Sequence, residues 1–225
     1  LHRKEHSFPT RRSSDLLKIY IEFVPSAGMQ FVTNIPWIET YGINYYIGLD
    51  GFSLTILMMI AILIPTAYLL LWEGKTKGYW INMLLVQSGV TGTLFSLDIV
   101  LFYFFWEVML LPVFLMIGSY GFGDKVFTTI KVTVYTMAGS LLMFVAILYL
   151  GVAHFNQFGE WSFAYDSLMQ ISTIPYDTKV WLFLAFLAAF AIKIPIFPLH
   201  TWIMETYKNA PTGAVFLLSS IMAKL

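Results

Sequence analysis

The sequence contains an apolar run long enough to cross a lipid bilayer, and this run limits the fold to the membrane class. Residues 52–72 contain no charged side chain. A bilayer core about 30 Å thick is crossed by roughly 20 apolar residues in a helix. Asp50 precedes the run and can cap its first turn, because its side chain can accept a free N–H group. The chain as a whole is 12% charged, whereas soluble domains are about 25% charged.

Further apolar stretches predict a bundle of membrane-spanning helices. The stretch from residue 80 to residue 118 is too long for one span, and the polar turn at residues 96–98 divides it. Asp98 in this turn is a second candidate helix cap. The predicted spans are residues 52–72, 80–97, 99–118, 127–153 and 180–202, with a sixth from about residue 212. The predicted fold class is therefore an all-α polytopic membrane protein.

The other segments divide the chain into three parts. Residues 1–16 are crowded with charged and histidine side chains, and no apolar core follows that would make them a signal peptide. We interpret them as an artefactual segment foreign to the protein. Residues 17–51 are predicted to be a loop with some interfacial helix that leads into the transmembrane domain, residues 52–225. We expect this domain to be incomplete, because its last apolar run stops at Leu225.

The lysines of the connecting segments predict the orientation of the bundle. Segments 73–78, 120–126 and 203–211 fall on one side and carry Lys75, Lys77, Lys125 and Lys208. The turn at 96–98 and the polar loop at 154–179 fall on the other side, with Lys179 alone. An excess of lysine and arginine marks the cytoplasmic or matrix side. The first side is therefore predicted to face the cytoplasm or matrix.

Composition excludes several other classes of function. The net charge is +0, which gives no reason to expect a nucleic-acid partner. The chain has no cysteine, so it cannot form disulfides or ligate an iron–sulfur cluster through thiolates. It also has no glycine-rich phosphate loop and no paired histidine and cysteine motif. We expect no cofactor or metal site in the chain itself.

Three charged residues fall inside the predicted spans: Glu107, Lys193 and Lys224. A charge at the centre of a membrane helix costs about 2.5–3.5 kcal/mol on the insertion scale. Such charges persist when they pair, line water or carry ions. At 1.5 Å of rise per residue, all three are predicted near the middle of the bilayer, in a lateral row.

Two interpretations of these charges remain open. Glu107 and Lys193 can form a structural ion pair that neutralises both. Alternatively they relay protons, because a buried lysine gains or loses its proton readily as a carboxylate approaches or withdraws. The lateral arrangement favours the relay.

The backbone near Lys193 also favours the relay. Pro195 and Pro198 remove helix hydrogen bonds around the lysine, and broken helices at membrane depth line protein or water. His200 follows the break and is either an interfacial residue or a further member of the relay. Lys131 is interpreted as a lysine that reaches the interface, with an access path as the alternative.

Several segments resemble the antiporter-like proton-pumping subunits of respiratory complex I. They are residues 104–112 (FFWEVMLLP), 191–202 (AIKIPIFPLHTW), 49–54 (LDGFSL) and 210–212 (APT) followed by Lys224. Their order along the chain also matches the family. The Met/Leu-Pro run after Glu107 is most similar to the subunit M branch, which is called chain 4 in mitochondria.

The resemblance implies an antiporter-like fold of two inverted repeats, truncated here after the first repeat. It implies that Glu107 is the acid of an ion pair, that Lys193 is the pumping lysine, that Lys224 lies on a central axis, and that His200 belongs to a hydrated path. NAD, FMN, iron–sulfur clusters and quinone are expected in partner subunits, and the lipid bilayer and other membrane subunits of the complex are expected as contacts. The expected location is the bacterial inner membrane, or alternatively the mitochondrial inner membrane. The alternative functions are a subunit of a multisubunit sodium/proton antiporter or membrane-bound hydrogenase, and a structural membrane scaffold.

Overall fold

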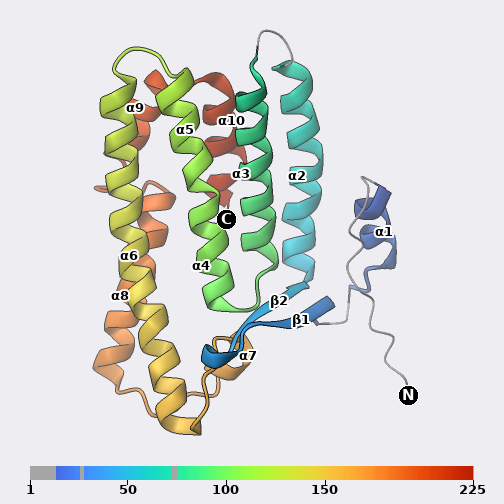
Figure 1. The fold of residues 1–225 in the computed structure, drawn as a ribbon, viewed down its shortest axis with the longest axis vertical. Coiled ribbons are helices and arrows are strands. Elements are labelled where there is room, and N and C mark those ends of the chain that lie inside the picture. The colour runs from blue at the N-terminus through green and yellow to red at the C-terminus, as the bar shows by residue number, and fades with distance from the viewer. Residues whose placement is uncertain (1–13, 26–27, 72–74, 225) are drawn as a thin grey trace.

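The computed structural model describes residues 14–25, 28–71 and 75–224, most of which lie in helices that run along one axis (Figure 1). The helices of the bundle are α2 (Gly51–Leu70), α3 (Lys77–Phe95), α4 (Ile99–Val108), α5 (Leu110–Tyr120), α6 (Lys125–Phe158), α8 (Tyr176–Lys193), α9 (Thr201–Asn209) and α10 (Thr212–Ser220). The remaining elements are α1 (Ser14–Glu22), β1 (Gln30–Ile38), η1 (Glu39–Tyr41), β2 (Ile43–Leu49), α7 (Tyr165–Leu168) and η2 (Met222–Lys224). The helical bundle confirms the predicted fold class.

Four helices, α2, α3, α4 and α6, begin where a polar side chain accepts a free N–H group of the first turn. Asp50 Oδ1 accepts the N–H of Ser53 at 2.8 Å and caps α2. Asp98 Oδ1 accepts the N–H groups of Val100 and Leu101 at 2.9 and 3.1 Å and caps α4. Both predicted caps are confirmed.

Three stretches among the described residues are long and apolar enough to cross a membrane: α2, the combined α4 and α5, and α6. Helix α3 occupies most of the predicted span 80–97. Over the predicted span 180–202, α8 begins one turn early at Tyr176 and ends at Lys193, where the predicted break of the helix follows. Pro195 explains the early end, since it has no N–H with which to continue the helix.

Glycines allow the helices around the predicted site to approach closely. A Cβ added at Gly89 of α3 would lie 2.6 Å from Met109 Cβ, at the junction of α4 and α5. A Cβ added at Gly139 of α6 would lie 2.8 Å from Ile192 Cδ1, near the end of α8. Such separations leave no room for a side chain. These glycines therefore set how closely α4 and α8, which carry the predicted site residues, approach their neighbours.

The predicted loop with some interfacial helix at residues 17–51 is wrong in part, because an antiparallel hairpin of β1 and β2 occupies much of it, whereas α1 agrees with the expected helix. Ile47 and Leu49 of β2 are buried under the bundle. The N–H of Leu97 donates to Tyr46 O at 2.8 Å, which attaches β2 to the turn between α3 and α4. Buried residues occupy both ends of β2, whereas Tyr45 in its middle is exposed. Of the predicted foreign segment, residues 1–13 lie outside the described residues, and residues 14–16 lie in α1.

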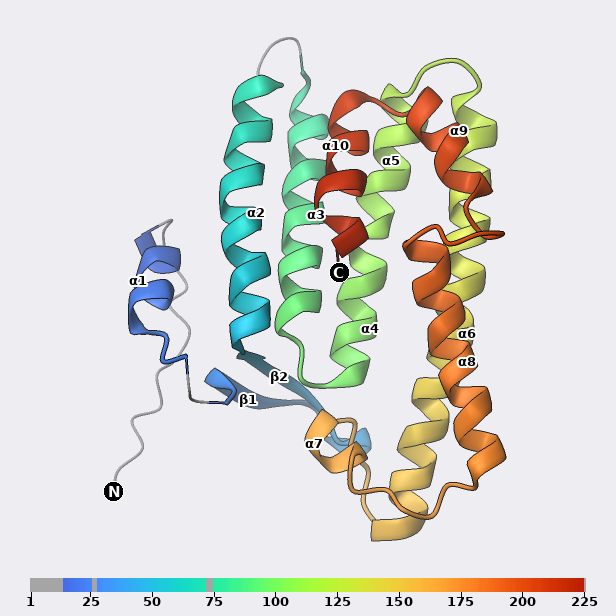
Figure 2. The ribbon, with the colours of Figure 1, turned by 180° about the vertical axis from the view of Figure 1, so that it is seen from behind.

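The two ends of the bundle carry different connections. The hairpin and α7 lie at one end, and α9 and the junction of α5 with α6 lie at the other (Figures 1 and 2). At the second end Thr76 Oγ1 and Tyr120 OH are 2.7 Å apart, and the N–H of Phe122 donates to Asn209 O at 2.6 Å. Lys75, Lys77, Lys125 and Lys208 belong to this end, and Lys179 to the hairpin end. The predicted grouping of the lysines is confirmed, and the side of the membrane that they face stays a prediction.

Candidate functional site

A break between α8 and α9 lies midway along the bundle, and Lys193 is the last helical residue before it (Figure 2). After the break the chain resumes as α9 at Thr201. Across it the N–H of Ile196 donates to Ala191 O at 2.9 Å, in place of the usual partner four residues back. The indole Nε1–H of Trp202 donates to Ile192 O at 2.9 Å. A side chain thus satisfies a carbonyl that the break deprives of its helix partner, as buried backbone requires.

Lys193 is buried, and its ammonium has no hydrogen-bond partner among the described residues. The residue is only 6% exposed. Its Nζ finds no acceptor among the residues that the structure describes. The nearest aromatic face is that of Trp106 on α4, whose ring centre is 4.5 Å from Nζ. An unpaired buried charge is costly, so this lysine is not explained as packing.

Glu107 lies beside Lys193 at the irregular junction of α4 and α5. Pro112 cannot donate to Val108 O, and the helix is interrupted at Met109. Glu107 interacts electrostatically with Lys193, but its buried Oε1 has no hydrogen-bond partner within the described part of the chain. Glu107 is therefore near enough to Lys193 for an electrostatic interaction, whereas neither the Lys193 ammonium nor Glu107 Oε1 is hydrogen-bonded within the described part of the chain. The pairing of the two residues stays a prediction.

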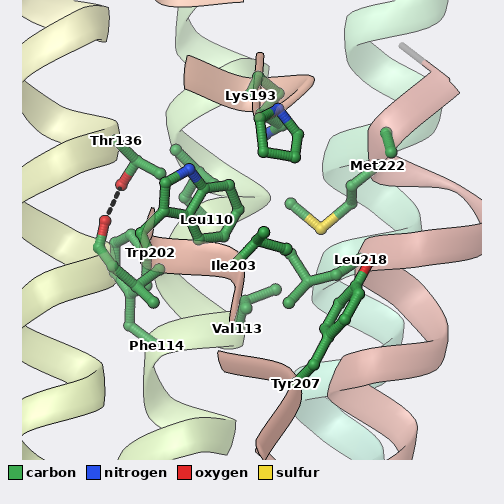
Figure 3. A pocket seen from close by; sticks show the side chains of 13 residues that line it. Leu110, Val113, Phe114, Thr136, Lys193, Trp202, Ile203, Tyr207, Leu218 and Met222 are labelled. Atoms are coloured by element: carbon green, nitrogen blue, oxygen red, sulfur yellow. Dashed lines mark hydrogen bonds between the residues drawn. The ribbon is translucent and has the colours of Figure 1, made fainter. Parts of the chain in front are cut away.

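A small cavity of about 30 Å³ adjoins Lys193 (Figure 3). Its walls come from α5, α6, α9 and α10 and from the break. They are formed by Leu110, Val113, Phe114, Val132, Thr136, Lys193, Pro195, Trp202, Ile203, Tyr207, Leu218, Met222 and Ala223. A cavity of this kind needs about 10–15 Å³ to hold one buried water molecule, so this cavity has room for one or two water molecules. The Oγ1–H of Thr136 donates to Val132 O at 2.8 Å. The lone pairs of Thr136 Oγ1 can therefore accept a hydrogen bond from a molecule in the cavity.

His200 lies on the broken segment but does not line this cavity. It immediately precedes α9. Its Nδ1 is buried and lacks a hydrogen-bond partner among the described residues, and its ring centre is 5.7 Å from that of Phe197. The structure thus places His200 on the same segment as Lys193. Its part in a relay stays a prediction.

Lys224 lies at the exposed end of η2. The predicted sixth span is wrong in its last part, because α10 ends at Ser220 and Lys224 lies in the 3-10 turn η2. The lysine is exposed, and its Nζ donates to Ser219 O. It does not line the cavity, although the neighbouring Met222 and Ala223 do. The lateral row of Glu107, Lys193 and Lys224 and the role of Lys224 both stay predictions.

The structure adds residues to the site that the sequence interpretation missed. Trp106 precedes Glu107 directly, but nothing in a row of aromatic residues tells which ring faces a lysine on another helix. Thr136 lies four residues from Val132 and is 5% exposed, so its helical spacing hints at an inner face. Tyr103 interacts with both Glu107 and Ser140. Residues 14–25, 28–71 and 75–224 contain no group of three His, Cys, Asp or Glu that could hold a metal, and the expected absence of a cofactor stays a prediction.

The chain is similar to membrane subunits of oxidoreductase complexes. The family profile described as "NADH:quinone oxidoreductase/Mrp antiporter, TM" matches residues 96–225. NADH-quinone oxidoreductase subunit M of Escherichia coli K12 is 33% identical over 199 residues, which are 85% of this chain and 39% of that protein. F(420)H(2) dehydrogenase subunit M of Methanosarcina mazei is 34% identical over 207 residues, which are 89% of this chain and 42% of that protein.

A solved structure has the same fold. A chain of respiratory complex I from Thermus thermophilus is 27% identical, with a TM-score of 0.81 over 93% of this chain and 44% of its own length. The chain spans about two fifths of the length of the curated relatives named above. The family match covers more than half of the chain and includes Glu107 and Lys193. The chain therefore belongs to the transmembrane family of NADH:quinone oxidoreductases and Mrp antiporters.

Proposed function

We propose that this chain is part of a proton-translocating membrane subunit of an NADH:quinone oxidoreductase. The observation that carries the proposal is the buried Lys193 ammonium, which lies at a helix break near Glu107 and a cavity with room for water. Within the part of the chain that the structure describes, this ammonium has no hydrogen-bond partner. A structural ion pair would be expected to have its charged groups hydrogen-bonded. The open arrangement suits a lysine that takes up and releases a proton.

The geometry supports a relay in which the separation of two charges controls the proton. A carboxylate close to a buried lysine stabilises the ammonium form, whereas burial alone favours the neutral amine. Movement of Glu107 toward Lys193 would load the lysine, and withdrawal would unload it. The interrupted helices at Met109 and after Lys193 supply backbone that can absorb such movement. The cavity would pass the proton through water.

The chain would act without a redox centre of its own. We propose that NAD, FMN, iron–sulfur clusters and quinone are bound by partner subunits, and that electron transfer there drives the movement of charge in this chain. The absence of cysteine fits this division, because thiolates hold most iron–sulfur clusters. The other membrane subunits of the complex would be its protein partners. The bacterial inner membrane is the proposed location, with the mitochondrial inner membrane as the alternative.

The test is NADH-driven acidification of membrane vesicles that contain the full-length protein with Lys193→Ala in its complex. NADH oxidation and assembly are measured in the same vesicles. Lys179→Ala is the matched control, because Lys179 lies on the same helix but is exposed near its other end. We expect Lys193→Ala to lose acidification in an assembled complex and Lys179→Ala to retain it. Normal acidification by Lys193→Ala would refute the proposal.

The alternatives give different results in related experiments. If Glu107 and Lys193 only hold the helices in register, a charge-neutral double replacement of both should preserve all activity. A sodium/proton antiporter subunit would give acidification that depends on sodium and not on NADH. The similarity to an F(420)H(2) dehydrogenase subunit makes the electron donor a further point to test, by supplying each donor to the same vesicles.

A further inference from the structure

The Lys193 ammonium lies over the face of a buried indole. Nζ is 4.5 Å from the ring centre of Trp106, within the roughly 6 Å at which a cation is attracted by the electron-rich face of an aromatic ring. Trp106 is 2% exposed and Lys193 is 6% exposed. Water therefore screens this attraction little, and the interaction belongs to the stronger, desolvated class.

The indole is the partner that the lysine has in this arrangement. Neither Lys193 Nζ nor Glu107 Oε1 is hydrogen-bonded to any residue that the structure describes. The acid and the base are therefore near each other but not joined through these atoms. A buried ammonium without compensation would be driven to give up its proton. The face of Trp106 supplies a compensation that does not depend on Glu107.

Neighbouring rings fix the orientation of Trp106. The ring centre of Phe102, one helical turn earlier on α4, is 5.5 Å away. The ring of Phe190 on α8 meets the indole edge-to-face, with centres 5.6 Å apart. Phe190 is three residues before Lys193, so the same helix that carries the lysine also holds the indole in place. The ring thus presents its face to Lys193 from a fixed position.

We propose that Trp106 is a positioning residue, which holds the protonated form of Lys193 while the lysine and Glu107 are apart. This inference rests on the proposed function. An aromatic face attracts an ammonium ion but offers little to a neutral amine. The indole would therefore retain the lysine only while it carries its proton. Loss of the proton would free the side chain, and the charge state itself would decide where Lys193 lies.

Few other titratable groups face Lys193. Glu107 and Tyr103 lie on α4, and Tyr207 of α9 lines the adjoining cavity. His200 follows on the broken segment. The cavity-lining residues of α5, α6 and α10 carry no titratable side chain. If a change at Trp106 alters the pH dependence of proton transfer, the effect can therefore be traced to Lys193 or to one of these few groups.

The test replaces Trp106 of the full-length protein, in its assembled complex, by tryptophans with one, two and three fluorine atoms. Fluorine withdraws electrons from the ring and weakens its attraction for a cation, while it changes the shape of the indole little. The pH profile of NADH-driven acidification is measured for each. Acidification should be lost at high pH, and we expect this loss to begin at progressively lower pH as fluorine atoms are added. The total shift should be about one pH unit, which corresponds to about a tenfold loss of proton affinity by Lys193. The matched control is the same series at Trp161, which stacks on Phe155 near the hairpin end of the bundle, and it should leave the profile unchanged.

The outcomes separate this inference from the proposed function. A pH profile that is unchanged across the Trp106 fluorine series would overturn the inference. This holds even if Trp106→Leu abolished pumping or assembly, because the shape of the side chain alone would then explain why a tryptophan is needed. In that case a loss of pumping in Lys193→Ala would leave the proposed function standing. If Lys193→Ala pumps normally, the proposed function fails and this inference fails with it. A graded shift at Trp106 and none at Trp161 supports the inference.

Discussion

Replacement of Asp98 by alanine should loosen the hairpin end of the bundle. The carboxylate is fully buried and joins α4 to β2. It accepts the N–H groups of Val100 and Leu101 in α4, and its second oxygen accepts the N–H of Asn44 in β2 at 3.1 Å. Loss of a helix cap costs about 1 kcal/mol, and a buried N–H left without a partner costs about 1–3 kcal/mol. Asp98→Ala should therefore lower the free energy of unfolding by about 2–4 kcal/mol.

The assay is denaturant unfolding of the purified full-length protein in detergent micelles, with proteolysis of the hairpin as a second measurement. Asp98→Asn keeps one acceptor oxygen and should lose about half as much as Asp98→Ala. Cleavage in the hairpin should become faster in both variants, because Asn44 would no longer be held to the turn between α3 and α4. A change of less than about 0.5 kcal/mol in Asp98→Ala, which is the usual range for surface substitutions, would refute the reasoning.

The same residue gives a pH dependence with a definite sign. Burial raises the pKa of the Asp98 carboxyl above its ordinary value of 3.8, although the N–H groups of Asn44, Leu101 and Val100 act to lower it. The folded state then binds the proton more tightly than the unfolded state. Stability contributed by this group is present below 3.8 and declines as the pH rises through the raised pKa. Asp98→Asn should lack this decline, and an identical slope in both proteins would show that other groups cause it.

Three further substitutions test how the bundle is held together. Trp202→Phe removes the donor to Ile192 O at the helix break, and it should cost about 1–3 kcal/mol of stability in micelle unfolding and reduce acidification by disturbing Lys193. Gly42→Ala places a side chain at a φ of +59°, against the carbonyl of Trp161, so it should cost more than about 1 kcal/mol and speed hairpin proteolysis. Gly92→Ala directs a methyl group into an aromatic ring of α4 and should lower the free energy of unfolding in micelles by about 1–3 kcal/mol. An unchanged free energy would mean that α3 can move away from α4.

Much of the helical architecture could be predicted because membrane spans are specified locally. The apolar run after Asp50 and the turn at Asp98 indicated two helix starts, and both side chains cap as predicted. Helix ends were less predictable. The structure ends α8 at Lys193, whereas hydrophobicity alone continued the span to residue 202. Apolar side chains are equally suited to a helix and to the broken segment that follows it, so composition does not locate the end.

The hairpin could not be predicted in the same way, because its stability depends on contacts that are distant in sequence. β2 is attached through the N–H of Leu97 to Tyr46 O, and through Asp98 to Asn44. An isolated two-stranded hairpin is marginal in water. The strand therefore forms on a surface that the turn between α3 and α4 provides. The sequence of β2, which is rich in tyrosine and contains Asn44, predicts a strand only weakly.

The sequence by itself determined that this chain crosses a membrane and that Glu107 and Lys193 are its unusual residues, because a charge in an apolar run is visible without a structure. It also indicated the break after Lys193, since proline removes a helix hydrogen bond wherever it stands. Only the tertiary structure decided which groups meet. It placed Lys193 over Trp106 and beside a small cavity, and it left Lys224 exposed and outside the lining of that cavity. The free-energy cost of burying a charge is a property of the residue itself, so the sequence shows it. The groups that a residue contacts depend on how helices distant in the sequence pack together, so only the tertiary structure shows them.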